Sequence, residues 1–114
     1  MAATQNISPG EAQTLDSLIT TTPQGIASRV LAKATGGNVT LFAFDAGQGL
    51  SEHTTPFDAL VIVLEGLVIL TIGGKAVEVV PGSLALMPGN VPHAVEAKDT
   101  SRMLLIMLKD VKPA

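Results

Sequence analysis

The stretch that decides the fold is ALVIVLEGLVIL, residues 59–70. It consists of two apolar runs, 59–64 and 67–70, separated by the dipeptide Glu65-Gly66. Neither run alternates between apolar and polar residues, and a strand that is apolar on both faces is buried on both faces. Glycine accepts the positive φ of a tight turn, so Gly66 marks the reversal between the runs. The stretch therefore predicts two buried strands joined by a turn.

The same turn signals continue toward the C-terminus. Three further turn dipeptides follow at intervals of eight residues, namely Gly73-Gly74, Pro81-Gly82 and Gly89-Asn90. A third doubly apolar run, residues 103–108, comes after the last of them. Short strands at regular spacing, separated by turn residues, are typical of an antiparallel sandwich or barrel. We therefore expect an all-β barrel whose core spans residues 39–108.

The N-terminal side of the chain predicts a different element. Ser8-Pro9-Gly10-Glu11 has the pattern of a helix start, with a capping Ser, Pro at the first helical position and Glu three residues after the Ser. We expect one short helix from Pro9 to Leu18 and, after a break at 20–25, a first strand over Ile26–Lys33. This helix and strand, residues 8–35, would belong with the barrel core to a single domain, 1–114.

The composition indicates that the protein associates with itself. The chain has 114 residues, of which 46% are hydrophobic and 15% are charged. A length of this order suits one domain, and so small a domain has little interior in which to hide apolar surface. The outer faces of the doubly apolar strands also need cover. We therefore expect a homodimer.

Other partners are not expected from the composition. The net charge is −3 and the Lys and Arg residues are scattered, which argues against nucleic acid. The longest apolar run, 59–64, is much shorter than the roughly 20 residues of a membrane helix, so no membrane partner is expected. Cysteine is absent, which excludes disulfides and thiolate sites, and residues 1–6 do not resemble a signal peptide. We expect a cytoplasmic protein.

Both histidines stand in segments with a recognisable spacing of glycine and proline. The positions that carry this spacing are Gly47, His53, Gly66, Gly82, Pro88 and His93. The spacing resembles the two motifs of the cupin family, G-x5-H-x-H-x3,4-E-x6-G and G-x5-P-x-G-x2-H-x3-N. The resemblance covers residues 39–108 and identifies the chain as a small single-domain cupin of the conserved-barrel type. It implies a jelly-roll barrel, or double-stranded β-helix, in which His53 and His93 point inward and lie side by side.

The sequence departs from these motifs at the ligand positions. In metal-binding cupins the resemblance implies three His and one Glu as ligands, whereas Thr55 and Ala59 (or Leu60 with the longer spacing) stand at two of those positions here. Asn90 and Ala97 replace the inner Gly and the Asn of the second motif. Asp58 is the nearest carboxylate, but strand alternation points it away from the site. We expect Asp58 to accept hydrogen bonds from the loop backbone instead.

These residues define the candidate site. His53, Thr55 and His93 are candidate ligand-binding residues, His53 and His93 are candidate metal ligands, and no residue is singled out as catalytic. Two imidazoles alone would hold a divalent metal weakly, and they could equally be hydrogen-bonded histidines of a metal-free interior. The methionines at 87, 103 and 107 are either soft ligands at a pocket wall or flexible core filler, and we favour filler.

The small residues at the two departures predict a cavity. Thr55 and Ala59 are smaller than the His and Glu of the motif, so space or ordered water should lie beside His53 and His93. That cavity should be polar on the histidine side and apolar toward Val61 and Val63. Such a site suits a small carbonyl or carboxylate ligand.

Three functions follow from this site. The first is a small dimeric cupin that binds a small molecule at His53 and His93, with or without a weakly held divalent metal. The second is a metal-dependent cupin enzyme, an oxygenase, decarboxylase or isomerase, that works with a reduced His ligand set. The third is metal-free catalysis, as the resemblance to cupin sugar epimerases implies, with either His as general base. The fold does not fix a reaction, so whether the protein is an enzyme stays open.

Overall fold

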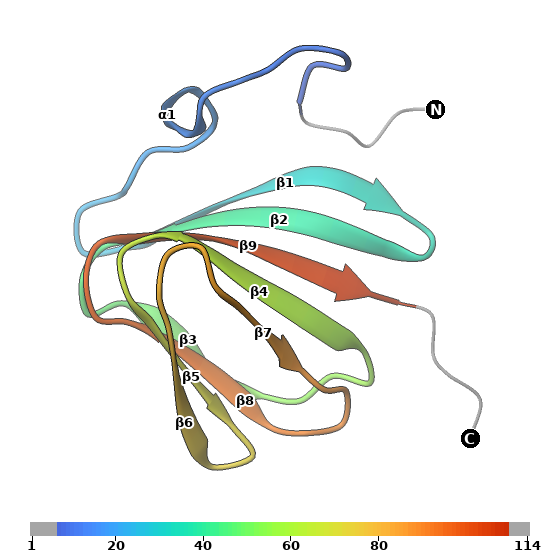
Figure 1. Cartoon of the computed structure of the whole chain (residues 1–114), viewed down its shortest axis with the longest axis vertical. Coiled ribbons are helices and arrows are strands. Elements are labelled where there is room, and N and C mark those ends of the chain that lie inside the picture. The colour runs from blue at the N-terminus through green and yellow to red at the C-terminus, as the bar shows by residue number, and fades with distance from the viewer. Residues whose placement is uncertain (1–6, 110–114) are drawn as a thin grey trace.

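The computed structural model describes residues 7–109. Within this range the chain forms a short helix followed by nine strands (Figure 1). In chain order the elements are α1 (Leu15–Leu18), β1 (Ile26–Ala34), β2 (Gly37–Phe44), β3 (Gly49–His53), β4 (Asp58–Glu65), β5 (Val68–Ile72), β6 (Lys75–Val79), β7 (Leu84–Met87), β8 (His93–Ala97) and β9 (Ser101–Leu108). The all-β class is confirmed.

The strands form two antiparallel sheets that pack face to face (Figure 1). Sheet A has five strands in the order β1-β2-β9-β4-β7, and sheet B has four in the order β3-β8-β5-β6. From β2 to β9 the chain passes repeatedly from one sheet to the other, which is the connectivity of a jelly roll. The predicted jelly-roll barrel is therefore the observed architecture.

The predicted turns occur where the glycines stand. Gly66, Gly73, Gly74 and Gly82 all adopt positive φ, and Asn90 does so as well, with φ of 66°. Asparagine is among the few side chains that tolerate this left-handed region. The four turns join β4 to β5, β5 to β6, β6 to β7 and β7 to β8.

The core lies between the two sheets. Its fully buried side chains include Phe44, Val61 and Met103 from sheet A and Val68 and Leu70 from sheet B. In β4 and β9 the inward residues are the odd-numbered ones, as the two-residue period of a strand requires. Burying each side chain of this kind contributes about 1.5–3 kcal/mol, so the shared core holds the sheets together.

A second, smaller apolar cluster lies on the outer face of sheet A. The N-terminal segment places Ile19 against Leu41 and Ala43 of β2, with α1 packed beside them. The segment covers only part of the face, because Leu84 and Leu86 of β7 remain 60% and 48% exposed. The outer face of sheet A is thus covered over β2 and exposed at β7.

The predicted N-terminal helix is correct in existence but wrong in extent. Instead of Pro9–Leu18, the helix covers only Leu15–Leu18 and is capped by the side chain of Thr14, which accepts from the Ser17 N–H. Gly10 has φ of 75°, which no α-helix allows. The side chain of Gln13 bonds both the N–H and the carbonyl of Ser8, so the expected capping box gives way to a closed loop.

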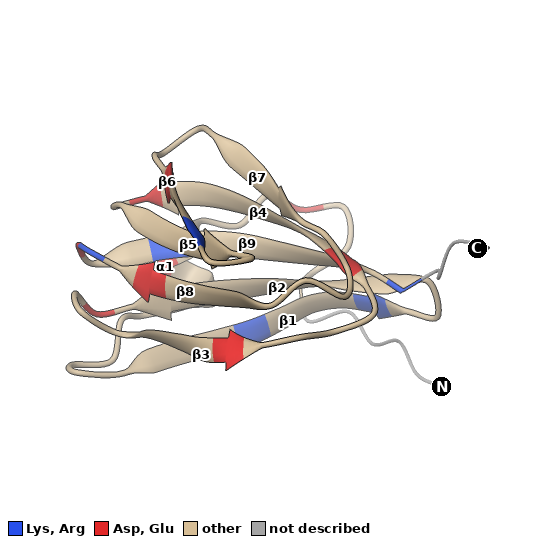
Figure 2. Cartoon of the chain, turned by 90° about the horizontal axis from the view of Figure 1, so that it is seen from below, with Lys and Arg blue, Asp and Glu red and all other residues tan. Residues whose placement is uncertain are grey.

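Charged residues are distributed over both sheets, whereas β2, β5 and β7 carry none (Figure 2). Among the described residues, no helix combines the length and the apolar character that crossing a bilayer would require.

Candidate functional site

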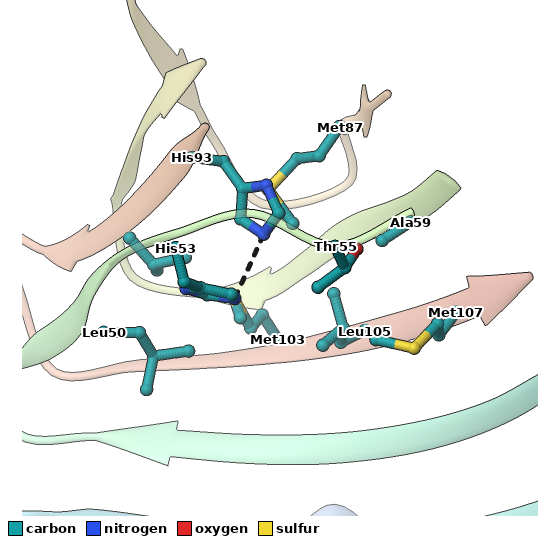
Figure 3. Close-up of a pocket in the computed structure, with 10 residues that line it drawn as sticks. Leu50, His53, Thr55, Ala59, Met87, His93, Met103, Leu105 and Met107 are labelled. Atoms are coloured by element: carbon teal, nitrogen blue, oxygen red, sulfur yellow. Dashed lines mark hydrogen bonds between the residues drawn. The ribbon is translucent and has the colours of Figure 1, made fainter. Parts of the chain in front are cut away.

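The two histidines meet between the sheets, at one edge of sheet B. His53 ends β3 and His93 begins β8, and the two residues are register partners across this strand pair. Their Nε2 atoms are 3.1 Å apart, and their rings meet edge to face (Figure 3). His93 is buried with 4% exposure, whereas His53 is exposed. His53 therefore stands at the mouth of the site and His93 inside it.

A β-bulge in β3 places His53 on the inner face. The register shifts between Leu50, which pairs with Val95, and His53, which pairs with His93. Without the shift, residues three apart on a strand would point to opposite faces. The bulge lets Leu50 and His53 both face the interior. No feature of the sequence predicted this bulge.

The loops that lead into β4 and β8 hold the histidines in place. The Asn90 N–H donates to the carbonyl of Thr55 at 2.6 Å, and the Gly89 N–H donates to Asp58 Oδ1 at 2.8 Å. A side chain at Gly89 would clash with the Pro56 carbonyl, which explains the glycine. Asp58 thus ties two loops together, as expected from the sequence, and does not line the site.

The outer nitrogens of both rings face backbone carbonyls. His53 Nδ1 lies 2.8 Å from the Ser51 oxygen, and His93 Nδ1 lies 3.1 Å from the Val91 oxygen. A carbonyl oxygen only accepts, so an Nδ1 that bonds to it carries the ring proton. In that tautomer of a neutral imidazole, Nε2 is the acceptor nitrogen. A direct hydrogen bond across the 3.1 Å between the two Nε2 atoms needs one ring to donate from Nε2 and the other to accept.

The two Nε2 atoms cannot bond to each other while both neutral rings donate from Nδ1. One extra proton shared by the pair would convert the contact into a hydrogen bond, and so would a ring that gave up its carbonyl partner. A ligand that offers a proton or a positive charge to both Nε2 atoms would satisfy the pair with its carbonyl bonds intact.

The predicted cavity lies beside the histidine pair. The volume within it that the centre of a water molecule can reach is about 30 Å³. One water molecule needs roughly 10–15 Å³ by this measure, so the cavity has room for water. Thr55 and Ala59 border it, as expected. Val61 and Val63 do not, because both are fully buried in the core below it. The complete lining is Leu50, His53, Thr55, Ala59, Met87, His93, Val95, Met103, Leu105 and Met107.

Methionines form much of the wall that sequence reasoning assigned to valines. Ala59 of β4 pairs with Met87 of β7 on one side and with Met107 of β9 on the other. Met103 faces the same interior four residues before Met107. The small alanine, at the position where the motif has glutamate, is thus flanked by two thioether side chains.

Thr55, the third candidate ligand-binding residue, lies at the cavity with its hydroxyl already engaged. Its Oγ1 donates to the Phe57 carbonyl and accepts from the Phe57 N–H, at 3.2 and 3.3 Å. These bonds fix the turn before β4. Binding a ligand at Thr55 Oγ1 would compete with them.

The residues present do not fit the metal site that the cupin motifs imply. Within residues 7–109, no three His, Asp or Glu side chains come close enough to hold one metal ion. The cavity contains two imidazoles and no carboxylate. A divalent ion held by protein ligands ordinarily takes three or four of them. The described residues therefore do not assemble the four-ligand divalent centre of metal-binding cupins.

Comparison with known proteins agrees with the geometry. The sequence model of the cupin domain matches residues 40–109, which include both histidines and all of the cavity lining. The chain belongs to the cupin family. A search of curated proteins found no relative of this cupin.

Solved structures with this fold cover nearly the whole cupin chain. A conserved protein of unknown function from Streptococcus pyogenes is 31% identical, with a TM-score of 0.88 over 96% of both chains. A cupin superfamily protein from Desulfitobacterium hafniense is 28% identical, with a TM-score of 0.85 over 93% of this chain and 97% of that one. A conserved-barrel cupin from Leptotrichia buccalis is 35% identical over 83% of this chain and 46% of its own, with a TM-score of 0.79.

Proposed function

We propose that this cupin binds a small organic molecule in the cavity beside His53 and His93. The observation that carries the proposal is the pair of Nε2 atoms that lie 3.1 Å apart in two rings that line the cavity. Their best organic partner is a hydrogen-bond donor, such as a hydroxyl, an amide N–H or a protonated carboxyl group. This refines the carbonyl or carboxylate ligand that the sequence suggests, because those groups only accept.

The cavity defines the rest of the ligand. Its volume admits only a few heavy atoms, and most of its wall is aliphatic or thioether. A ligand would therefore place one polar group at the histidines and a short apolar body among the methionines. A longer molecule could extend past His53, which is exposed at the mouth.

A ligand screen by NMR tests the proposal. The probes are carboxylic acids, amides and alcohols of about two to five heavy atoms. We expect saturable shifts at the ring signals of both histidines and at the Met87 methyl group, and loss of binding in His53→Ala. Glu52→Gln, which changes the exposed neighbour of His53, should bind as the native protein does. If no probe shifts these signals at millimolar concentration, the proposal is wrong.

The proposal includes a homodimer formed through the outer face of sheet A. The side chains that the N-terminal segment leaves open include Leu84 and Leu86 of β7 and Leu108 of β9, which are 60%, 48% and 44% exposed. The uncharged strand β7 is also the edge of the sheet. An apolar patch of this kind can pack against its own copy in a second subunit, as a two-fold interface requires.

The alternative of a metal-dependent oxygenase, decarboxylase or isomerase has one supporting observation. The spacing of the two Nε2 atoms suits two ligands of one metal. Elemental analysis of protein purified without a histidine tag separates the two functions. Stoichiometric metal that is lost in His53→Ala would favour the enzyme, and metal-free protein that binds the organic probes would favour the binding protein.

A further inference from the structure

The histidine and methionine side chains of the described residues line one cavity. The sequence contains two histidines and four methionines, and the fourth methionine is Met1, outside the described residues. Both histidines and the three other methionines line the same cavity of ten residues. Core filling alone would distribute methionines over the interior, where Val, Leu and Ala occupy most other positions.

From this convergence we propose that the cavity binds a single soft cation, Cu(I). The ligands are the Nε2 atoms of His53 and His93 on sheet B and the thioether sulfurs of Met87 and Met103 on sheet A. Met107 serves as a further, more distant thioether. The proposal rests on the proposed function in one respect, that the histidine pair is the ligand-binding element.

The spacing of the two imidazole nitrogens is close to that of a metal chelate. Metal–nitrogen bonds to imidazole are about 2.0–2.1 Å long, so two of them at a tetrahedral angle hold their nitrogens roughly 3.3 Å apart. The observed separation is 3.1 Å. Nδ1 of each ring also lies at hydrogen-bond distance from a backbone carbonyl, that of Ser51 for His53 and that of Val91 for His93. Such bonds fix the ring and the tautomer of a metal-ligating histidine.

The thioether side faces the imidazoles from the other sheet. Met87 and Met107 flank Ala59 on the inward face of adjacent strands, where neighbouring Cβ atoms lie roughly 4.5–5.5 Å apart. In Figure 3 the side chain of Met87 reaches toward the ring of His93, whereas Met107 lies toward the opposite end of the cavity. Met87 and Met103 are almost completely buried, so their sulfurs are shielded from water.

The charge of the lining selects the kind of cation. The cavity contains no carboxylate, so its lining offers a cation no negative charge. A divalent ion would keep its full double charge in a poorly solvated site, which is costly, whereas a monovalent ion brings half of that charge. Thioether and imidazole donors together suit Cu(I), while Mg²⁺, Ca²⁺ and Mn²⁺ prefer oxygen ligands. The binding involves no change of oxidation state.

A competition titration tests this site directly. Cu(I) is supplied without oxygen, in the presence of a reductant, and a coloured Cu(I) chelator competes with the full-length protein. We expect one Cu(I) per chain, and at least about tenfold weaker affinity for Cu(I) in the double variant Met87→Leu/Met103→Leu. Leucine conserves the apolar volume, so the variant should fold, which circular dichroism checks. Met107→Leu should weaken binding less than the double variant.

A second metal and a second method separate the roles of the ligands. Zn(II) affinity should fall in His53→Ala but change less than about threefold in the methionine double variant, since Zn(II) binds thioethers poorly. X-ray absorption of the Cu(I) protein should show sulfur neighbours that disappear in the double variant. If the methionine variants bind Cu(I) as tightly as the native protein, the thioether ligands are wrong.

The outcomes also distinguish this site from organic ligand binding. If the native protein leaves Cu(I) with the chelator but binds the small organic probes, the metal site is wrong and the proposed function stands. If the native protein takes up Cu(I) with the methionine dependence described and binds no organic probe, the metal site stands alone. If it takes up neither, both proposals are wrong.

Discussion

The two antiparallel sheets differ in the polarity of their outer surfaces. On sheet A, the row across β7, β4 and β9 reads Leu86, Leu60 and Ile106. On sheet B, the corresponding row across β6, β5 and β8 reads Glu78, Ile69 and Glu96. Both rows have an aliphatic residue at the centre, but only sheet B has exposed carboxylates beside it. Along this row the outer surface of sheet B is therefore more polar than that of sheet A.

The inner faces differ in chemistry as well. Around the cavity, sheet A contributes thioethers and sheet B contributes imidazoles. The site exists only where the two sheets come together, so the connections between them matter for function as well as for stability.

The largest expected effect is at the crossover from β4 of sheet A to β5 of sheet B. Gly66 has φ of 86°, and a Cβ there would collide with the Ser101 hydroxyl and the Thr100 carbonyl. We expect Gly66→Ala to lower the free energy of unfolding by about 3 kcal/mol or more, measured by urea denaturation.

Gly74→Ala is the matched control for this change. Gly74 has φ of 84°, but a Cβ there would meet nothing within 4 Å. Gly74→Ala should therefore lower the free energy of unfolding only by the cost of holding alanine in the left-handed conformation, about 1–2 kcal/mol. Equal losses of unfolding free energy in Gly66→Ala and Gly74→Ala would show that a Cβ at position 66 meets no steric clash.

The second effect is on self-association. Leu84→Glu/Leu86→Glu introduces charge on the exposed face of sheet A, and we expect it to convert a dimer into a monomer, as measured by light scattering. Ala76→Glu adds charge to the outer face of β6, the edge strand of sheet B, and should leave the dimer intact. A native protein that is a monodisperse monomer at high micromolar concentration would refute the dimer.

The contrast between the sheets also explains what the sequence predicted and what it did not. Doubly apolar runs and the turn at Gly66 are local signals, so the strands, the turns and the fold class could be predicted. The pairing of His53 with His93 came from motif spacing. The bulge after Leu50 and the placement of Met87 and Met107 beside Ala59 depend on register between distant strands, which no local pattern reveals.

The N-terminal helix shows the opposite failure. The local pattern Ser8-Pro9-Gly10-Glu11 predicts a helix start, but a loop closed by Gln13 forms instead. Packing of Ile19 against sheet A gives a short segment its place without requiring a long helix. Tertiary contacts override a capping signal that contributes only about 1 kcal/mol.

A smaller effect concerns the ion pairs of the two sheets. Arg102 of sheet A contacts Asp16 at 2.6 Å and Glu65 at 3.4 Å, and its side chain is only 14% exposed. These contacts attach the N-terminal segment to the sheet. We expect Arg102→Gln to lower the free energy of unfolding by about 1 kcal/mol, less at high salt.

The corresponding pair on sheet B serves as its control. Lys98 lies 3.8 Å from Glu96, and both side chains are 54% exposed. Because water solvates both groups, Lys98→Gln should change the free energy of unfolding by less than about 0.5 kcal/mol. A loss equal to that of Arg102→Gln would mean that the contacts of Arg102 do not hold the N-terminal segment.

The smallest effect is a pH dependence at the connection from β2 of sheet A to β3 of sheet B. The Gln24 N–H donates to Asp45 Oδ2 at 2.6 Å, and the Ala46 N–H and the Thr100 hydroxyl donate to Oδ1. The bond from Gln24, followed by those from Ala46 and Thr100, holds the pKa of the Asp45 carboxyl below its ordinary value. Folding therefore favours the ionised carboxylate.

The sign of the pH effect follows from this lowered pKa. A carboxyl group whose pKa is lower in the folded state stabilises the fold at pH values above its ordinary pKa of about 3.9. This contribution is lost as the pH falls through the folded-state pKa. Asp45→Asn should therefore be less stable than the native protein at neutral pH, with the difference shrinking below about pH 4. Thr100→Val, which removes only the last of the three bonds, should give a smaller difference in the same pH range. Urea denaturation between neutral pH and about pH 3 measures both differences, and a gap that stays constant on acidification would show that the carboxylate does not join these loops.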